Sequence, residues 1–202
     1  MDNNKIFGCS VSTEYTNVPT YNSVDAKLPQ TYSYISVMPP IENQGVTSKC
    51  VAYSICSWLD WHKNISEHDN NGDQFNVDEI YGVRRDKSSN GMMITEALHF
   101  LANTSLSNYK INGYSKIGSI ENAKAALVVN GPIVAGIGVH SYNSDFWNGT
   151  ENFGGHCILL IGYNDKGFII RNSWGSLFGN DGYTLLPYNE FNSIFEAWTI
   201  IA

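Results

Sequence analysis

The spacing of hydrophobic positions divides the chain into a helical first half and a strand-rich second half. Three- and four-residue spacing predicts helices over about 48–62, 75–85, 93–103 and 120–130. After Gly131 and Pro132 the period becomes strand-like, with apolar runs over 133–139, 156–163, 167–172, 183–186 and 197–201. Helices followed by strands predict an α+β fold built from two segregated lobes.

The first predicted helix has a cysteine at its start. Thr47 and Ser48 precede the apolar run as helix-start residues, and Val51 and Ile55 belong to its buried face. At a helix N-terminus, unpaired amide N–H groups and the helix dipole favour a thiolate, so Cys50 is a candidate nucleophile with a lowered pKa. The alternative is that Cys50 is a small buried hydrophobic residue.

A histidine and an asparagine lie far downstream, on two predicted strands. His156 begins one apolar run, a turn follows at Asn164 and Asp165, and Asn172 ends the next run. Two antiparallel strands joined by that turn bring His156 and Asn172 side by side. Cysteine, histidine and an orienting amide are the groups that thiol acyl transfer needs, because the thiolate attacks, the imidazolium protonates the leaving group and the amide fixes the ring.

These motifs make the sequence similar to the papain family of cysteine peptidases. Gln44 stands six positions before Cys50, where that family keeps its oxyanion-hole glutamine. His156 and Asn172 match the catalytic histidine and asparagine, and Trp174 in NSWG matches the tryptophan that shields the bond between them. Several separated motifs in one order are more specific than any single motif. The resemblance implies a papain-like two-lobed fold, a helical lobe plus an antiparallel β-sheet or barrel lobe, with the active site in the cleft between them.

The resemblance also implies a division of the chain. It covers residues 28–202 as a peptidase domain, with a helical lobe over about 42–131 and a β lobe over about 132–202 plus 28–41. Residues 1–27 are polar and lack a helical period, so they form an N-terminal arm or a short pro-like extension. This segment is too short and irregular to be the family's helical prodomain. Two hypotheses stay open, partial cover of the cleft by the arm and its removal by cleavage.

The stretch SNGMMITEALHFL aligns with the family's substrate-binding turn and the helix after it. Asn90 and Gly91 match the part that pairs its backbone with the substrate, and Met92 replaces a usual glycine, which narrows the cleft. Met93 and Ile94 are expected to line a pocket for one substrate side chain. That side chain belongs to the residue just before the one whose carbonyl group is attacked. The alternative for Ile94 is a place in the helix core.

Other positions depart from the family pattern. Lys49 and Val51 flank the nucleophile where a small residue and a tryptophan are usual, and Gly155 stands where many members have an aspartate or asparagine before the histidine. Thr47 and Ser89 replace both halves of a common disulfide. That joint loss favours a reducing compartment such as the cytoplasm.

Composition excludes other classes. A hydrophobic fraction of 43% and a charged fraction of 15% are those of a globular protein, and a net charge of -7 without a basic cluster excludes nucleic acid as a partner. No apolar run reaches the ~20 residues that span a bilayer, and the N-terminus lacks the features of a secretory signal. We expect no membrane association, and the resemblance implies a monomer that acts on a peptide or protein without a cofactor or metal.

The leading hypothesis is a cysteine endopeptidase that hydrolyses peptide bonds through a Cys-His-Asn acyl-enzyme mechanism. A thiol amidase or cell-wall hydrolase would use the same chemistry, and a non-catalytic binding module could share the scaffold. Crosslinking of glutamine to amines is also chemically open, because amines as well as water can resolve an acyl-thioenzyme.

Overall fold

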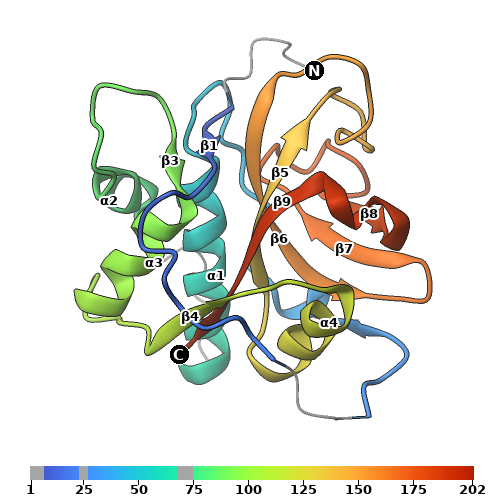
Figure 1. Ribbon diagram of the computed structural model, residues 1–202, viewed down its shortest axis with the longest axis horizontal. Helices are drawn as coiled ribbons and strands as arrows, with labels where there is room; N and C mark the ends of the chain where they lie inside the picture. The colour runs from blue at the N-terminus through green and yellow to red at the C-terminus, as the bar shows by residue number, and fades with distance from the viewer. Residues whose placement is uncertain (1–6, 23–26, 68–74) are drawn as a thin grey trace.

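The computed structural model describes residues 7–22, 27–67 and 75–202 and has helices on one side and, on the other, a large sheet with one further helix packed against it (Figure 1). The helices are α1 (Cys50–Glu67), α2 (Val77–Gly82), α3 (Ile94–Asn103) and α4 (Ile120–Val129), with short 3-10 helices η1 (Ile35–Val37) and η2 (Tyr188–Ser193). The strands are β1 (Cys9–Ser10), β2 (Tyr32–Ser33), β3 (Met92–Met93), β4 (Gly113–Lys116), β5 (Ile133–Val139), β6 (Gly154–Tyr163), β7 (Gly167–Arg171), β8 (Tyr183–Pro187) and β9 (Ile194–Ile201). The predicted α+β fold class is confirmed.

The large sheet is antiparallel, with the strand order β4-β9-β5-β6-β7-β8 and with β2 paired to β6. Among the described strands this sheet stays open and does not close into a barrel. Residues of β5 and β6 face each other in a regular register that includes Gly136 with Cys157 and Ile137 with His156. This register fixes the strand that carries His156 against the rest of the sheet.

Strand β6 separates two hydrophobic cores. Its side chains alternate, so Leu159 and Ile161 join the core around α1 and α3, whereas Ile158 and Leu160 join the core beneath α4. Trp58 lies at the centre of the first core, and its indole N–H donates to the Pro132 carbonyl oxygen at 2.9 Å. Helix α1, which begins at the candidate nucleophile Cys50, is therefore held tightly against the sheet.

Two predicted helix starts are confirmed by their caps. The Asn76 side chain accepts a hydrogen bond from the Asp78 backbone N–H, and the Ser119 side chain accepts one from Asn122. Helix α1 continues to residue 67, five residues past its predicted end. The sequence pattern missed β4, because its Gly-Tyr-Ser-Lys sequence has no apolar alternation and its pairing with β9 supplies the extended conformation.

Helix α4 and strand β4 both pack with the sheet, although they precede the expected start of the β lobe at about residue 132. Within residues 28–41, β2 also joins the sheet, since Tyr32 and Ser33 pair with Tyr163 and Gly162 of β6. The polar, glycine-containing sequence over 66–73 predicts a loop, and most of that stretch lies outside the described residues. Within the described ranges, no helix combines the length and apolar character needed to cross a membrane.

Candidate active site

The three residues of the expected catalytic set come from three different elements. Cys50 is the first residue of α1, His156 lies near the start of β6, and Asn172 directly follows β7. His156 Nε2 and Asn172 Oδ1 are 2.8 Å apart, which is a good hydrogen-bond distance. The Cys50 sulfur accepts a hydrogen bond from the backbone N–H of Cys157, the residue after His156. The helix start and the histidine strand therefore meet at one place, where all three side chains are buried.

Trp174 covers the histidine. Its ring centroid lies 4.6 Å from that of His156, at an interplanar angle of 31°. Phe146 and Phe178 pack against the other sides of Trp174 at 5.1 and 4.9 Å. This aromatic cluster keeps bulk water away from the His156–Asn172 hydrogen bond and fills the space behind it, so shielding and core packing are both present.

Gln44 lies in a loop that pairs with the segment after Asn172. Its backbone N–H donates to the Ser173 carbonyl oxygen at 2.8 Å, and its side-chain Oε1 accepts from Ser173 Oγ at 2.7 Å. Its Nε2 donates to the Thr47 carbonyl oxygen at 2.7 Å. The Gln44 side chain therefore braces this loop. Because an amide nitrogen carries two N–H groups, binding of an oxyanion is compatible with these contacts.

A tyrosine that the sequence did not single out joins the two loops on either side of the nucleophile. The Tyr81 hydroxyl lies 3.0 Å from Ser48 Oγ and accepts a hydrogen bond from the Gly91 backbone N–H at 3.1 Å. Thr47 and Ser89, next to these two contacts, are the positions where the resemblance would have placed a disulfide. Hydrogen bonds through Tyr81 thus connect the loop before Cys50 to the turn at Gly91. All four cysteines, in contrast, are free thiols.

A buried arginine supports the other side of the site. Arg171, next to Asn172 in sequence, donates through its guanidinium to the carbonyl oxygens of Pro39 and Pro40 at 2.8 and 2.5 Å. It also lies 3.3 Å from Ser57 Oγ on α1. An arginine that ends an apolar run is a weak sequence signal, but its contacts connect the Asn172 loop to the nucleophile helix.

The residues expected to bind substrate lie along one edge of the site, with one exception. Asn90 is exposed, Gly91 has a φ of 89°, and Met92 and Met93 form β3. The pocket-lining function of Ile94 stays a prediction, and its side chain lies fully buried in the core around α1, where its alternative places it. The reason is that α3 begins at Ile94, which turns this side chain inward.

The flanking residues have clear local partners. Lys49 forms an ion pair with Asp78 on α2, and its ammonium lies 5.8 Å from the Tyr81 ring centroid. The Lys49 side chain therefore points toward α2 and forms its ion pair there. Val51 is buried in α1. Gly155 lies against the carbonyl oxygen of Cys9, which would be 2.1 Å from a Cβ atom added at Gly155.

The N-terminal arm enters the site. The sequence left open whether this arm covers the cleft. The Met92 backbone N–H donates to the Gly8 carbonyl oxygen at 2.8 Å, and the Phe7 ring meets His156 edge-on at a centroid distance of 6.1 Å. An apolar group at residues 7–9 within an otherwise polar arm is the one sequence signal of this contact.

Burial changes the acidity of the Cys50 thiol. It raises the pKa of the Cys50 thiol from 9.0 to about 12, although backbone hydrogen bonds from Cys157, Gly8 and Val51 act in the opposite direction. The helix-start argument predicted a lowered pKa. It omitted the desolvation of the sulfur, which outweighs those hydrogen bonds while the arm lies in the site.

The chain belongs to the papain family of cysteine proteases, whose family profile matches residues 69–196. It is 39% identical over 97 residues to an uncharacterised peptidase C1-like protein of Acanthamoeba polyphaga mimivirus, an alignment that covers 40% of this chain and 31% of that protein. It is 28% identical over 138 residues to gamete and mating-type specific protein A of Dictyostelium discoideum, covering 63% of this chain. The chain thus spans about 30% of the length of these curated relatives.

Solved structures give the same fold. Xylellain, a cysteine protease from Xylella fastidiosa, superposes with a TM-score of 0.80 at 22% identity, covering 98% of this chain and 97% of that one. A procathepsin B from Trypanosoma congolense superposes with a TM-score of 0.75 at 15% identity, covering 98% and 88%.

Proposed function

We propose that the chain is a cysteine endopeptidase whose nucleophile is Cys50. The observation that supports this most is the 2.8 Å contact between His156 and Asn172, made beneath Trp174 and beside the cysteine at the start of α1. Family membership adds to it, because the papain family is a family of peptidases. The peptidase domain in this proposal spans residues 28–202, with the arm before it.

The proposed reaction starts with transfer of the Cys50 proton to His156. The thiolate attacks the substrate carbonyl carbon, and the resulting oxyanion receives hydrogen bonds from Gln44 Nε2 and the Cys50 backbone N–H. His156 then gives its proton to the leaving amine as the C–N bond breaks, which leaves an acyl-thioenzyme. Water, deprotonated by His156, attacks that acyl group and releases the carboxylate product and the free thiol. Asn172 holds the imidazole ring in place through both halves of the reaction.

The proposed substrate is an extended stretch of peptide or protein. The Met92 backbone N–H, which already donates to one extended segment, supports pairing along Gly91, Met92 and Met93. Asn90 lies at the open end of this edge, and Gly155 leaves room on the opposite wall. The protein acts in this proposal as a monomer, in a reducing compartment and without a metal or cofactor.

A peptide-cleavage assay with matched variants tests the proposal. Casein and a peptide library should be cleaved by a form whose site is accessible, and Cys50→Ser and His156→Ala should abolish cleavage while circular dichroism shows that both variants remain folded. Turnover of peptidoglycan without cleavage of peptides would favour the amidase alternative. Binding of peptides without cleavage of either substrate would favour the binding module.

A further inference from the structure

A small polar pocket lies next to Asn172, between α1 and the sheet (Figure 1). The residues with polar side chains that line it include Glu42, Ser54, Ser57, Arg171 and Asn172. Its volume is about 10 Å³, which is the room that one water molecule needs. Glu42 is half-buried and the other four residues are buried, so polar groups that border this pocket need hydrogen-bond partners there.

One end of the Asn172 amide has no acceptor among the described residues. Its Oδ1 accepts from His156 Nε2 and from the Ser173 backbone N–H, at 2.8 and 2.7 Å. Its Nδ2 is buried, and within the part of the chain that the structure describes no group accepts a hydrogen bond from it. Buried N–H groups in proteins are nearly always hydrogen-bonded, either to protein or to an ordered water. The pocket that Asn172 lines is the place where such an acceptor fits.

A directional chain of hydrogen bonds ends at Glu42 on another wall of the pocket. The Arg171 guanidinium donates to Ser57 Oγ at 3.3 Å, and Ser57 Oγ donates its own hydrogen to the Glu42 carboxylate at 2.7 Å. An ionised carboxylate only accepts hydrogen bonds, and its two oxygens offer about four lone-pair positions. The Glu42 carboxylate is therefore a suitable acceptor for a further donor in the pocket.

The charges around the pocket favour a neutral, dipolar occupant. Arg171 is 3% exposed, and a buried cation is stable only when it is hydrogen-bonded and paired with negative charge. The Glu42 carboxylate supplies negative charge one hydroxyl group away from Arg171. One wall of the pocket is thus positive and another is negative, so the pocket orients a dipole and does not select an ion of either sign. Its volume restricts that dipole to a water molecule.

We propose that this pocket binds a water molecule that accepts a hydrogen bond from Asn172 Nδ2 and donates one to the Glu42 carboxylate, which makes Glu42 a positioning residue for Asn172 and His156. Ser54, which also lines the pocket, carries a hydroxyl oxygen that is an acceptor for the second water hydrogen. The inference rests on the proposed peptidase function for its catalytic meaning, whereas the water site itself does not depend on catalysis.

The bound water fixes which end of the Asn172 amide faces His156. A half-turn of the amide would direct Nδ2, which is a donor, at the N–H groups of His156 and Ser173. The water holds Nδ2 on the side of α1 and so opposes this turn. The negative charge of Glu42 polarises the water and the amide in one direction, which strengthens Oδ1 as the acceptor for the imidazole.

Nuclear magnetic resonance on the isotope-labelled full chain tests the water site. The side-chain amide protons of Asn172, assigned by their loss in Asn172→Ala, should give a cross-peak with water whose sign is that of a long-lived contact. Ser54→Val fills the pocket with a methyl group and should abolish this cross-peak. Ser66→Val, on the exposed end of the same helix, is the matched control and should preserve it. A missing cross-peak in the full chain, or an unchanged one in Ser54→Val, would overturn the site.

A double-mutant cycle tests whether Glu42 acts through Asn172. It is measured in the background of Gly8→Ala, whose added Cβ atom clashes with the Ser48 carbonyl oxygen and displaces the arm from the site. Glu42→Gln should lower kcat about 2- to 10-fold with KM unchanged, which corresponds to the loss of one hydrogen bond. In Asn172→Ala, the same change at Glu42 should have no further effect. Glu190→Gln is the control, because Glu190 is also half-buried and does not line the pocket.

The outcomes separate the water site from the proposed function. Decreases in kcat that multiply when Glu42→Gln and Asn172→Ala are combined would show that Glu42 acts independently of Asn172, and would overturn its positioning function. An unchanged kcat in Glu42→Gln would do the same. A water cross-peak that behaves as expected, in a protein that cleaves no peptide, would leave the water site standing and contradict the peptidase function instead.

Discussion

His156 Nε2 and Asn172 Oδ1 lie 2.8 Å apart although 16 residues separate them, because the antiparallel pairing of β6 and β7 returns the chain to the same end of the sheet. Asn172 Oδ1 also accepts from the Ser173 backbone N–H at 2.7 Å. The amide is thus fixed by its own loop before it contacts the imidazole. The orientation of the proposed proton-transfer group consequently depends on the loop after β7.

Asn172→Ala should lower kcat for peptide cleavage with little change in KM. The variant removes one hydrogen bond to the imidazole, a loss of about 1–3 kcal/mol, which corresponds to about a 5- to 150-fold decrease in rate. Steady-state kinetics measures it in the Gly8→Ala form, whose added Cβ atom would lie 2.1 Å from the Ser48 carbonyl oxygen and displace the arm from the site. Asn112→Ala is the matched control, because Asn112 is exposed and lies outside the site. An unchanged kcat in Asn172→Ala would show that this residue does not orient His156.

Gln44→Ala should separate oxyanion binding from loop bracing. Loss of one oxyanion donor costs about 2.7–4 kcal/mol, so kcat should fall about 100- to 1,000-fold. Alkylation by iodoacetamide forms no oxyanion, and its rate at Cys50 should therefore stay within about twofold. Ser173→Ala, which removes only the partner of Oε1, is the control and should affect thermal stability more than kcat. Equal losses in both reactions would mean that Gln44 acts by bracing the loop.

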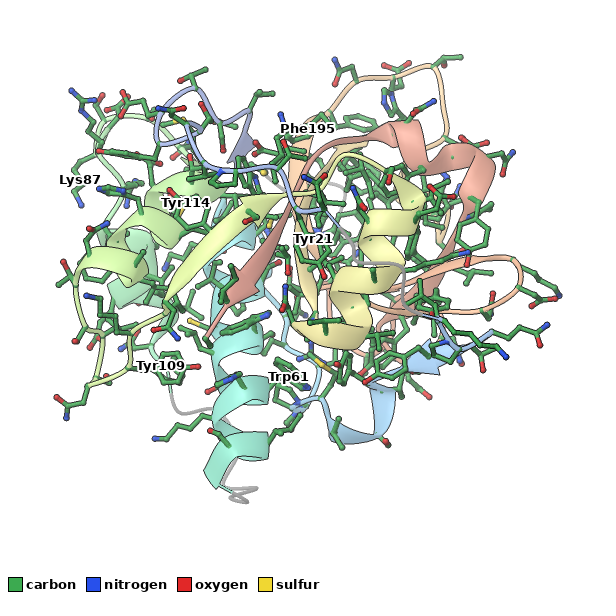
Figure 2. The ribbon with its side chains drawn as sticks, turned by 60° about the horizontal axis from the view of Figure 1, so that its bottom comes forward. Tyr21, Trp61, Lys87, Tyr109, Tyr114 and Phe195 are labelled. Atoms are coloured by element: carbon green, nitrogen blue, oxygen red, sulfur yellow. The ribbon has the colours of Figure 1, made fainter. Side chains whose placement is uncertain are left out.

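Tyr81→Phe should raise KM with little change in the alkylation rate of Cys50. The hydroxyl connects Ser48 to the Gly91 turn, and its loss frees the edge that is proposed to pair with the substrate. Two hydrogen bonds worth about 0.5–1.5 kcal/mol each are removed. Tyr21→Phe, on the arm beyond the site (Figure 2), is the control. A KM equal to that of the unsubstituted protein would show that the connection does not shape substrate binding.

The pH dependence of Cys50 alkylation by iodoacetamide should differ between the full chain and Gly8→Ala. Burial raises the pKa of the Cys50 thiol to about 12, so the folded protein, with the arm in the site, holds this proton more tightly than the unfolded chain does. Its contribution to stability is complete below the ordinary thiol pKa of 9.0 and is lost as the pH rises toward about 12. The alkylation rate of the full chain should keep rising above about pH 9, whereas that of Gly8→Ala should level off at a lower pH. Coinciding profiles would contradict this.

The sequence predicts well what local rules and separated motifs determine. Asn76 and Ser119 begin their helices as expected, since a side-chain oxygen next to an apolar run satisfies the first free N–H groups. The proposed catalytic residues were found because their order and spacing are specific. Strand β4 was missed, because only its pairing with β9 makes Gly113–Lys116 extended.

The contacts of the arm depend on tertiary structure and could not be predicted in detail. No spacing rule connects Gly8 with Ser48 or Cys9 with Gly155, which are close only after both lobes have formed. The pKa of Cys50 shows the same limit. The helix start predicts a lowered pKa, and burial by the arm and by the sheet raises it.

Labelling of Cys50 by an epoxysuccinyl peptide tests the central claim most directly, with intact mass and peptide mapping on the Gly8→Ala form. The account predicts one adduct per chain, on Cys50, that is absent from His156→Ala and slow to form on the unsubstituted full chain. A folded Gly8→Ala protein whose Cys50 reacts with iodoacetamide but never with the epoxysuccinyl peptide would contradict it. The cysteine would then be accessible without an assembled peptidase site.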